Sequence, residues 1–213
     1  MAGTTIKAVV FDLGETLVDE TRQWETVAQA AGIPFFTFAG LLGGIIERHL
    51  PHRAIFEELG IPPVKVAEHG YRLEARDFYP DAIPTLRAVQ ERGYLLGIAA
   101  NQPDGVVERL AELDLPLDLN ATSTSLGVAK PDPRFFEQIV ARLDVRPDEI
   151  VYIGDRLDND ILPAHAYGMH AVFIKRGPWG HIHATWPQIG RVKHRISSLD
   201  EVFAVLDRID GRD

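Results

Sequence analysis

The sequence contains no cysteine, which excludes a disulfide framework and any thiolate chemistry. It also lacks an apolar run long enough to cross a membrane. The apolar stretch near the N-terminus is interrupted by Asp12 and is too short for the hydrophobic region of a signal peptide. We therefore expect a cytoplasmic protein with no membrane partner.

Positive charge is also scarce. The chain carries 22 Lys and Arg residues against 31 Asp and Glu, a formal net charge of -9. Proteins that bind nucleic acid normally present a basic face, so we expect no nucleic-acid partner. The one basic cluster, formed by Arg191, Lys193, His194 and Arg195, is interpreted as a solvated turn. Nothing in the sequence indicates the oligomeric state.

The remaining composition is typical of a globular protein. Of the 213 residues, 46% are hydrophobic and 25% are charged, which supplies ample material for a core. The length favours one domain with a modest insertion over two large independent domains.

Short buried strands alternate with helical patterns along most of the chain. Apolar runs that stop at polar or glycine residues predict strands at 6–11, 94–100, 149–153 and 170–174. Helical spacing predicts helices at 82–92, 104–113, 133–143, 160–167 and 198–209, the last capped by Ser197 or Ser198. This alternation predicts an α/β fold, a parallel sheet with helices on both faces and a ligand crevice beyond the carboxyl ends of its strands.

Residues 18–77 interrupt the alternation. They contain helical patterns at 20–31, 36–50, 53–59 and 64–75, separated by turn signals, and no convincing strand. We expect an all-helical insertion directly over the end of the first strand. The stretches 17–19 and 77–81 join it to the sheet and are expected to act as hinges.

Asp12 directly follows the first buried strand, so its carboxylate is expected to point into the ligand crevice. An aspartate placed there acts as a nucleophile or as a metal ligand. Capping of the following turn is the structural alternative.

A second buried strand delivers three acids within six residues: Asp155, Asp158 and Asp160. Such oxygen-only ligands suit Mg²⁺, because unpaired carboxylates repel one another unless they share a cation. The alternative is a helix N-terminus. We assign Asp155 to the metal, Asp158 to the helix N-terminus, and Asp160 to a mixed role in holding the site together.

Lys130 lies beside Pro131 just before a predicted helix. Its charge would neutralise both a phosphoryl group and the nucleophile. A solvated surface lysine is the alternative reading.

The order of these motifs resembles the haloacid dehalogenase-like hydrolase superfamily. Its four motifs match residues 12–17, 98–101, 130–131, and Gly154-Asp155 with Asp160. The likeness implies a Rossmann-like core of residues 1–17 and 78–213, and a helical cap of the first type over residues 18–77. It also implies a hydrolase that acts on a small phosphorylated molecule.

The resemblance further implies the roles of individual residues. Asp12 and Lys130 would be catalytic, and Mg²⁺ would be held by Asp12, Asp155, Asp160 and the backbone carbonyl of Gly14. Substrate contacts would come from Gly14, Glu15, Ala100 and Asn101.

Two positions depart from the family pattern. Phosphatases of this family usually carry a second Asp as a general acid and base two residues after the nucleophile, where this chain has Gly14. Such a group contributes about 10²–10⁴ in rate, so we expect a preference for aryl or acyl phosphates, which are good leaving groups. The neighbouring Glu15 is a candidate substitute.

The second departure is the loss of the usual Ser or Thr of the second motif, where the alignment places Ala100. The side-chain amide and backbone N–H of Asn101 are candidates for the missing hydrogen-bond donors.

Three functions follow from these features. The leading one is Mg²⁺-dependent phosphomonoester hydrolysis through an aspartyl-phosphate on Asp12. The second is carbon-halogen hydrolysis, although the dehalogenases carry Tyr-Gly-Thr where this chain has Gly14-Glu15-Thr16. The third is a catalytically impaired protein that only binds its ligand.

Substrate choice is expected to lie in the cap, whose aromatic and cationic side chains face either the crevice or the cap's own core. They are Trp24, Phe35, Phe36, Phe38, Arg48, His49, His52 and Arg53. Trp179 and Trp186 are expected to edge the site or to pack against a partner subunit.

Overall fold

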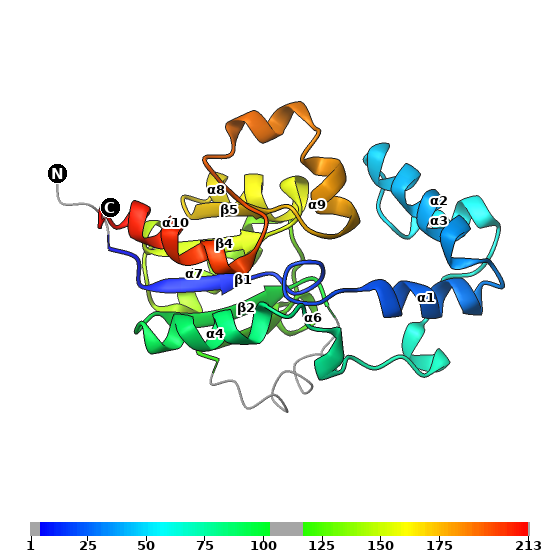
Figure 1. The fold of residues 1–213 in the computed structure, drawn as a ribbon, viewed down its shortest axis with the longest axis horizontal. Helices are drawn as coiled ribbons and strands as arrows, with labels where there is room; N and C mark the ends of the chain where they lie inside the picture. Colours follow the sequence, from blue (N-terminus) through cyan, green and yellow to red (C-terminus); the bar gives the residue numbers. More distant parts are fainter. Residues whose placement is uncertain (1–4, 103–116, 213) are drawn as a thin grey trace.

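The computed structural model describes residues 5–102 and 117–212, so the predicted helix at 104–113 lies outside the described residues. Within them, strands form one parallel six-stranded sheet in the order β3-β2-β1-β4-β5-β6 (Figure 1). The strands are β1 (Ala8–Phe11), β2 (Leu95–Ala100), β3 (Leu119–Thr122), β4 (Ile150–Gly154), β5 (His170–Ile174) and β6 (His194–Ile196). The predicted α/β class and the four predicted strands are confirmed.

Helices cover both faces of the sheet because strand side chains alternate between the faces. Val9 and Phe11 of β1 pack on one face against α4 (Ala82–Glu91) and α10 (Val202–Ile209). Ala8 and Val10 pack on the other against α7 (Pro133–Leu143) and α8 (Leu162–Ala166). All four β1 residues are completely buried, which explains why this run is apolar on both faces.

Several elements were not predicted. Strands β3 and β6 are short and polar, and the helices α6 (Ser123–Leu126) and α9 (Gly177–His183) are also new. The helix predicted at 160–167 begins as a π-helical turn, Leu157–Ile161, before α8. Short 3-10 turns occupy Pro147–Glu149, Pro187–Arg191 and Leu199–Glu201, the last capped by Ser198.

The interpretation of the basic cluster as a solvated turn was wrong. His194 and Arg195 lie in β6, which pairs with β5. Lys193 and Arg195 are exposed while His194 is buried, the alternation of an edge strand with one covered face.

The segment between β1 and α4 is helical in the part of the chain that the structure describes. It contains α1 (Thr21–Ala30), α2 (Phe35–Glu47), α3 (Ala54–Leu59) and the 3-10 turns Val66–His69 and Ala75–Asp77. The helix predicted at 64–75 was wrong: Gly70, at φ 83°, sits in the left-handed region and interrupts the helical path.

This helical insertion, residues 18–77, has its own small core, which includes Phe38, Ile45 and Ile55. It lies beyond the carboxyl end of β1 (Figure 1). Among the described residues no single helix is long and apolar enough to span a membrane, and only α1 and α2 together, bent by 108°, reach that length and composition.

Two chain segments join the insertion to the sheet and pair with each other. Val18 forms an antiparallel bridge with Phe78, the Asp19 N–H donates to the Asp77 carbonyl at 2.8 Å, and the Tyr79 N–H donates to the Leu17 carbonyl at 2.9 Å. A short two-stranded connection therefore carries the insertion over the end of β1.

Candidate active site

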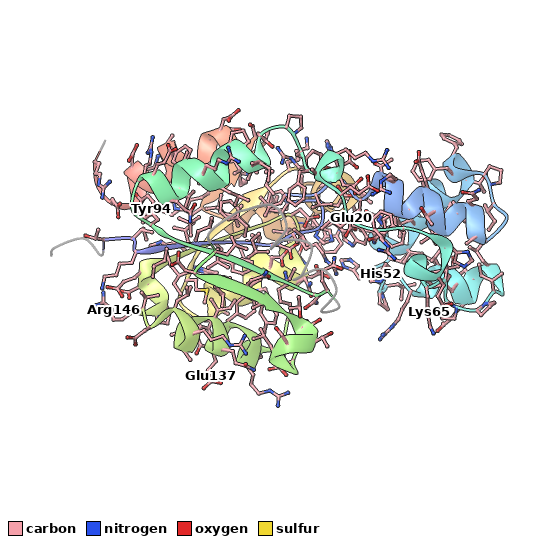
Figure 2. All side chains as sticks on the ribbon, turned by 90° about the horizontal axis from the view of Figure 1, so that it is seen from below. Glu20, His52, Lys65, Tyr94, Glu137 and Arg146 are labelled. Carbon is pink, nitrogen blue, oxygen red and sulfur yellow. The ribbon has the colours of Figure 1, made fainter. Side chains whose placement is uncertain are left out.

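A cavity of about 670 Å³ lies where the insertion meets the carboxyl end of the sheet. The residues that line it from the insertion are Glu20, Gln23, Trp24, Pro51, His52 and Arg53. Those that line it from the sheet side are Asp12, Gly14, Glu15, Asn101, Gln102, Ala129, Lys130, Pro131, Asp155, Arg156, Asn159 and Trp179. Figure 2 places Glu20 and His52 at this junction.

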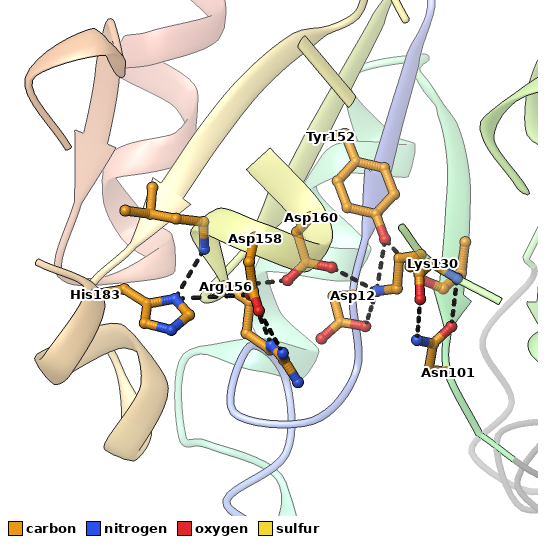
Figure 3. Close-up of polar contacts among 10 residues, drawn as sticks. Asp12, Asn101, Lys130, Tyr152, Arg156, Asp158, Asp160 and His183 are labelled. Atoms are coloured by element: carbon orange, nitrogen blue, oxygen red, sulfur yellow. Dashed lines mark hydrogen bonds and ion pairs between the residues drawn. The ribbon is translucent and has the colours of Figure 1, made fainter. Parts of the chain in front are cut away.

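The predicted nucleophile, Asp12, follows β1 at the floor of the cavity. Its backbone N–H donates to the Ile153 carbonyl at 2.8 Å, so pairing with β4 fixes the position at which the carboxylate leaves the sheet. The ammonium of Lys130 donates to Asp12 Oδ1 and to Asp160 Oδ1, both at 2.6 Å (Figure 3). The structure thus brings together residues from three separate motifs.

Lys130 is buried and held by four neighbours. Its ammonium donates to the Tyr152 hydroxyl at 3.0 Å, and that hydroxyl donates to the Ala99 carbonyl at 2.8 Å. The side chain of Asn101 holds the Lys130 backbone: Oδ1 accepts from the Lys130 N–H at 2.8 Å, and Nδ2 donates to its carbonyl at 2.9 Å. The reading of Lys130 as a solvated surface lysine does not describe this residue.

Charge pairing sets the protonation of this group. Burial alone would lower the pKa of Lys130, but the charges of Asp12 and Asp160 raise it well above its usual range. Burial raises the pKa of Asp160 to about 6, against the opposing effect of Lys130. Lys130 is therefore a fixed cation at neutral pH.

Asp155 is the acid whose position is most consistent with a metal ligand. It is 1% exposed, and its Oδ2 has no hydrogen-bond partner among the described residues. One oxygen each from Asp12, Asp155 and Asp160 lie within 4.8 Å of one another. Burial, then the charges of Asp160 and Asp12, raises the pKa of Asp155 well above its usual range. A bound cation would offset the repulsion among these buried carboxylates and would give Asp155 Oδ2 a partner.

The other two acids of the motif have different surroundings. Asp160 Oδ2 accepts from the Arg156 backbone N–H at 3.1 Å, so this residue ties the loop to Lys130. Asp158 lies in the first turn of the π-helical segment Leu157–Ile161, as assigned from the sequence, and its carboxylate also accepts from the Arg156 guanidinium at 2.8 and 3.1 Å.

Gly14 and Glu15 follow Asp12 in a tight turn. Glu15 has φ 54°, in the left-handed region, and its N–H donates to the Val18 carbonyl at 2.7 Å. Its carboxylate accepts from the Tyr79 hydroxyl at 2.7 Å and packs against Gly177. Burial raises the pKa of Glu15 to about 7.

The second motif ends β2. Ala100 is 2% exposed, and the cavity-lining residues begin one position later, at Asn101. Asn101, predicted to contact the substrate, lines the cavity, and its side-chain amide is hydrogen-bonded to the Lys130 backbone.

The sequence interpretation missed Glu20, which directly precedes α1. A Cβ added to Gly14 would lie 2.8 Å from Glu20 Cδ and closer still to Oε1, so the two positions share one space. Gln102 Nε2 donates to Glu20 Oε1 at 3.4 Å. Burial, then the charges of Glu15 and Asp12, raises the pKa of Glu20 to about 8. The signal in the sequence that could have pointed to Glu20 was the glycine at position 14, which leaves space for another side chain.

Aromatic rings connect the insertion to α9. Trp24 of α1 lies 6.1 Å from Trp179 of α9 between ring centroids, and His52 lies within 6.3 Å of both. The His49 ring lies 4.0 Å from Trp186. Trp179 therefore edges the cavity, and Trp186 packs on the insertion.

The remaining side chains considered for substrate choice point elsewhere. Phe38 is buried in the insertion's core, Arg48 pairs with Glu58, and Phe36 is 90% exposed. Of the eight, only Trp24, His52 and Arg53 are among the cavity-lining residues.

Comparison with known proteins agrees with this geometry. Residues 6–168 match the family model of haloacid dehalogenase-like hydrolases. A glyceraldehyde 3-phosphate phosphatase of Methanopyrus kandleri is 31% identical over 82% of this chain and 86% of its own. An (S)-2-haloacid dehalogenase of a Pseudomonas species is 32% identical, but over 62% of this chain and 57% of its own.

A solved structure leads to the same family. The HAD phosphatase from Thermococcus onnurineus superposes with a TM-score of 0.64 at 26% identity, covering 94% of this chain and 98% of that protein. The family resemblance deduced from the motifs and the expectation of a hydrolase are confirmed. The chain belongs to the haloacid dehalogenase-like hydrolase family.

Proposed function

We propose that this hydrolase is a Mg²⁺-dependent phosphomonoesterase for a small phosphorylated molecule, and that Asp12 carries the phosphoryl group as an aspartyl-phosphate. The observation that carries the proposal is the shared position of Asp12, Lys130 and Asp155 at one end of the cavity. A nucleophile, a fixed cation and an unpaired buried acid are the parts that phosphoryl transfer requires.

The donor set fits a hard divalent cation. Its ligands would be Asp12, Asp155 and the Gly14 carbonyl, with Asp160 at hand, and all of these donors are oxygens. Oδ2 of Asp155 has no hydrogen-bond partner in the part of the chain that the structure describes, which supports a cation site at this position. When bound, Mg²⁺ would supply positive charge that reduces the repulsion between these carboxylates and a phosphoryl group.

The protein's own residues account for the first half of the reaction. Lys130 orients Asp12 through the hydrogen bond to its Oδ1, and its charge stabilises the negative phosphoryl group as Asp12 attacks phosphorus. Asn101 fixes the Lys130 backbone rather than the substrate. Glu15 and Gly14 remain proposed substrate contacts because both line the cavity.

We also propose that residues 18–77 act as a cap domain on a core of residues 1–17 and 78–213. The paired connection at Val18 and Phe78 and the separate core of the insertion support this division. Substrate selection would then fall to Trp24, His52 and Arg53.

The direct test is phosphate release from p-nitrophenyl phosphate and from glyceraldehyde 3-phosphate, the substrate named for several relatives, with and without Mg²⁺. We expect turnover that requires the metal, and loss of at least about 10³-fold in Asp12→Asn, whose amide is not nucleophilic. Silence on a broad panel of esters with Mg²⁺ present would contradict the proposal.

Carbon-halogen hydrolysis is the second candidate, favoured by the identity with a haloacid dehalogenase. Here Asp12 would attack carbon, and no metal would be needed. Metal-independent chloride release from a 2-haloacid would support it, and strict Mg²⁺ dependence would remove it. Tight ligand binding without turnover would indicate an impaired binding protein.

A further inference from the structure

Glu20 occupies the space in front of Gly14 on the wall of the cavity. A Cβ on Gly14 would lie 2.8 Å from the carboxyl carbon of Glu20, closer than real side chains approach. Glu20 therefore brings a carboxyl group to the place where a side chain of residue 14 would begin. A side chain at position 14 and the carboxyl group of Glu20 cannot occupy this space together. Because residue 14 is a glycine, the Glu20 carboxyl group can lie there.

Two hydrogen bonds involve Glu20. Its backbone carbonyl accepts from the Trp24 N–H at 2.9 Å, which joins this residue to the first turn of α1. Gln102, two residues after β2, donates from Nε2 to the carboxyl Oε1 at 3.4 Å. Glu20 lines the same cavity as Asp12, the residue on which the phosphoester would form.

Phosphoryl transfer needs a group that gives a proton to the leaving oxygen and later takes one from water. The other acids and bases on the sheet side of the cavity are already engaged. Lys130 is bound to Asp12 and Asp160, and Glu15 is bonded to the Tyr79 hydroxyl. Asp155 has the surroundings of a cation ligand.

The remaining titratable groups that line the cavity are also poorly suited. The His52 ring packs at an edge angle against Trp24 and Trp179. The guanidinium groups of Arg53 and Arg156 are hydrogen-bond donors with no acceptor site. Among the described cavity-lining residues, Glu20 is the acid whose carboxyl group lies where a side chain of residue 14 would begin, and it is bonded there to the neutral amide of Gln102.

We propose that Glu20 is the general acid and base of this enzyme, an assignment that rests on the phosphomonoesterase function proposed above. In the first step an Asp12 oxygen bonds to phosphorus, the bond from phosphorus to the ester oxygen breaks, and protonated Glu20 gives its proton to that oxygen. An alcohol leaves. In the second step ionised Glu20 takes a proton from water as the water oxygen bonds to phosphorus. The bond to Asp12 breaks, which restores both residues and releases phosphate.

This assignment reverses the preference expected from the sequence. With Glu20 as acid, alkyl phosphates with poor leaving groups are substrates, and aryl or acyl phosphates have no special advantage. It also changes the interpretation of Gly14, which now provides space for the Glu20 carboxyl group. A side chain at position 14, even the aspartate usual in the family, would collide with Glu20 unless that carboxyl group moved.

The test compares Glu20→Gln with wild type on an alkyl phosphate and on p-nitrophenyl phosphate. We expect kcat/KM for the alkyl ester to fall about 10²–10⁴-fold, because its alkoxide needs a proton. For p-nitrophenyl phosphate, kcat/KM should fall by less than about 10-fold, because its leaving group needs no proton. Acid quenching should reveal accumulated phosphoprotein in the variant, because the base for the second step is lost.

Two further variants serve as controls. Glu25→Gln removes one carboxylate from the exposed side of α1, the helix that Glu20 precedes. It should leave kcat/KM unchanged for both the alkyl ester and p-nitrophenyl phosphate. Gly14→Ala leaves Glu20 in the sequence but displaces its carboxyl group, and it should show the same selective loss on the alkyl ester. Circular dichroism of each variant confirms folding.

The outcomes separate this proposal from the one on which it depends. An equal loss on both esters in Glu20→Gln, or the leaving-group effect in Glu15→Gln instead, would overturn the role of Glu20 while wild-type turnover through Asp12 stood. Absence of wild-type turnover on every ester would overturn both proposals together.

Discussion

At the residue scale, the site depends on a lysine whose side chain and backbone are fixed by different neighbours. Asp12, Asp160 and Tyr152 hold the ammonium, whereas Asn101 holds the backbone with two hydrogen bonds of 2.8 and 2.9 Å. Removing one partner of a buried ion pair is costly because a charge remains without its counterion. The position of Lys130 is therefore determined in part by residues, Tyr152 and Asn101 among them, that need not touch the substrate.

Replacement of Asn101 tests this division of roles. Asn101→Ala deletes both hydrogen bonds, so we expect the free energy of unfolding to fall by about 2 kcal/mol. We expect kcat to fall by about 10-fold or more on all esters alike, because a displaced lysine affects every substrate. Urea denaturation and steady-state kinetics measure the two effects. Unchanged stability together with a raised KM would show that Asn101 binds substrate rather than Lys130.

The same scale explains what the sequence could not provide. Asp12 and Asp155 were predictable because each follows a buried strand, and Lys130 was predictable because it adjoins Pro131 just before a predicted helix. Glu20 was not, because it is eight residues from Asp12 and reaches the cavity only through the turn that places α1. The Glu20 carboxyl group fills the space that a side chain at position 14 would occupy, and no local sequence pattern predicts that contact.

At the element scale, strands with β-branched apolar runs were predictable and short polar ones were not. β1, β2, β4 and β5 are buried on both faces, so burial selects a continuous apolar run. Strand β6 contains His194 and Arg195 and, among the described strands, pairs only with β5, so its sequence resembles a basic turn. Pairing with β5, not composition, makes it a strand.

Burial of His194 in β6 predicts a pH dependence of stability. Both ring nitrogens are buried without a partner among the described residues, and burial lowers the pKa of His194 from 6.5 to about 4. Between those values the unfolded chain binds the proton more tightly, so the free energy of unfolding falls as pH falls from 6.5 towards 4. The loss between pH 7.5 and 5 should be about 2 kcal/mol for this residue.

Urea denaturation at pH 7.5 and 5 measures this effect in wild type and in His194→Leu. The leucine variant should lose less stability between the two pH values, because its side chain cannot be protonated in either state. His181→Leu replaces an exposed histidine of α9 and should keep the wild-type dependence. Equal pH dependence in wild type and His194→Leu would contradict the prediction.

At the scale of the whole molecule, the contact between the insertion and the core is built largely from aromatic rings. The chain has three tryptophans, and all three lie there: Trp24 on the insertion, Trp179 on α9, and Trp186 against His49. Each is at most 7% exposed. Because the insertion joins the core only through the paired segments near Val18 and Phe78, separation of this contact would admit substrate and uncover the rings.

Tryptophan emission would therefore report a motion of the proposed cap. We expect ligand-free protein to emit at longer wavelength than protein with Mg²⁺ and vanadate, because an open cap exposes indole rings to water. The radius of gyration from solution scattering should decrease on the same addition. Trp24→Phe keeps an apolar ring at the contact and leaves Trp179 and Trp186 as reporters, so the shift should become smaller without disappearing. Identical emission and scattering with and without vanadate, under conditions where vanadate inhibits turnover, would mean that the cap stays docked and that substrate reaches Asp12 by another route.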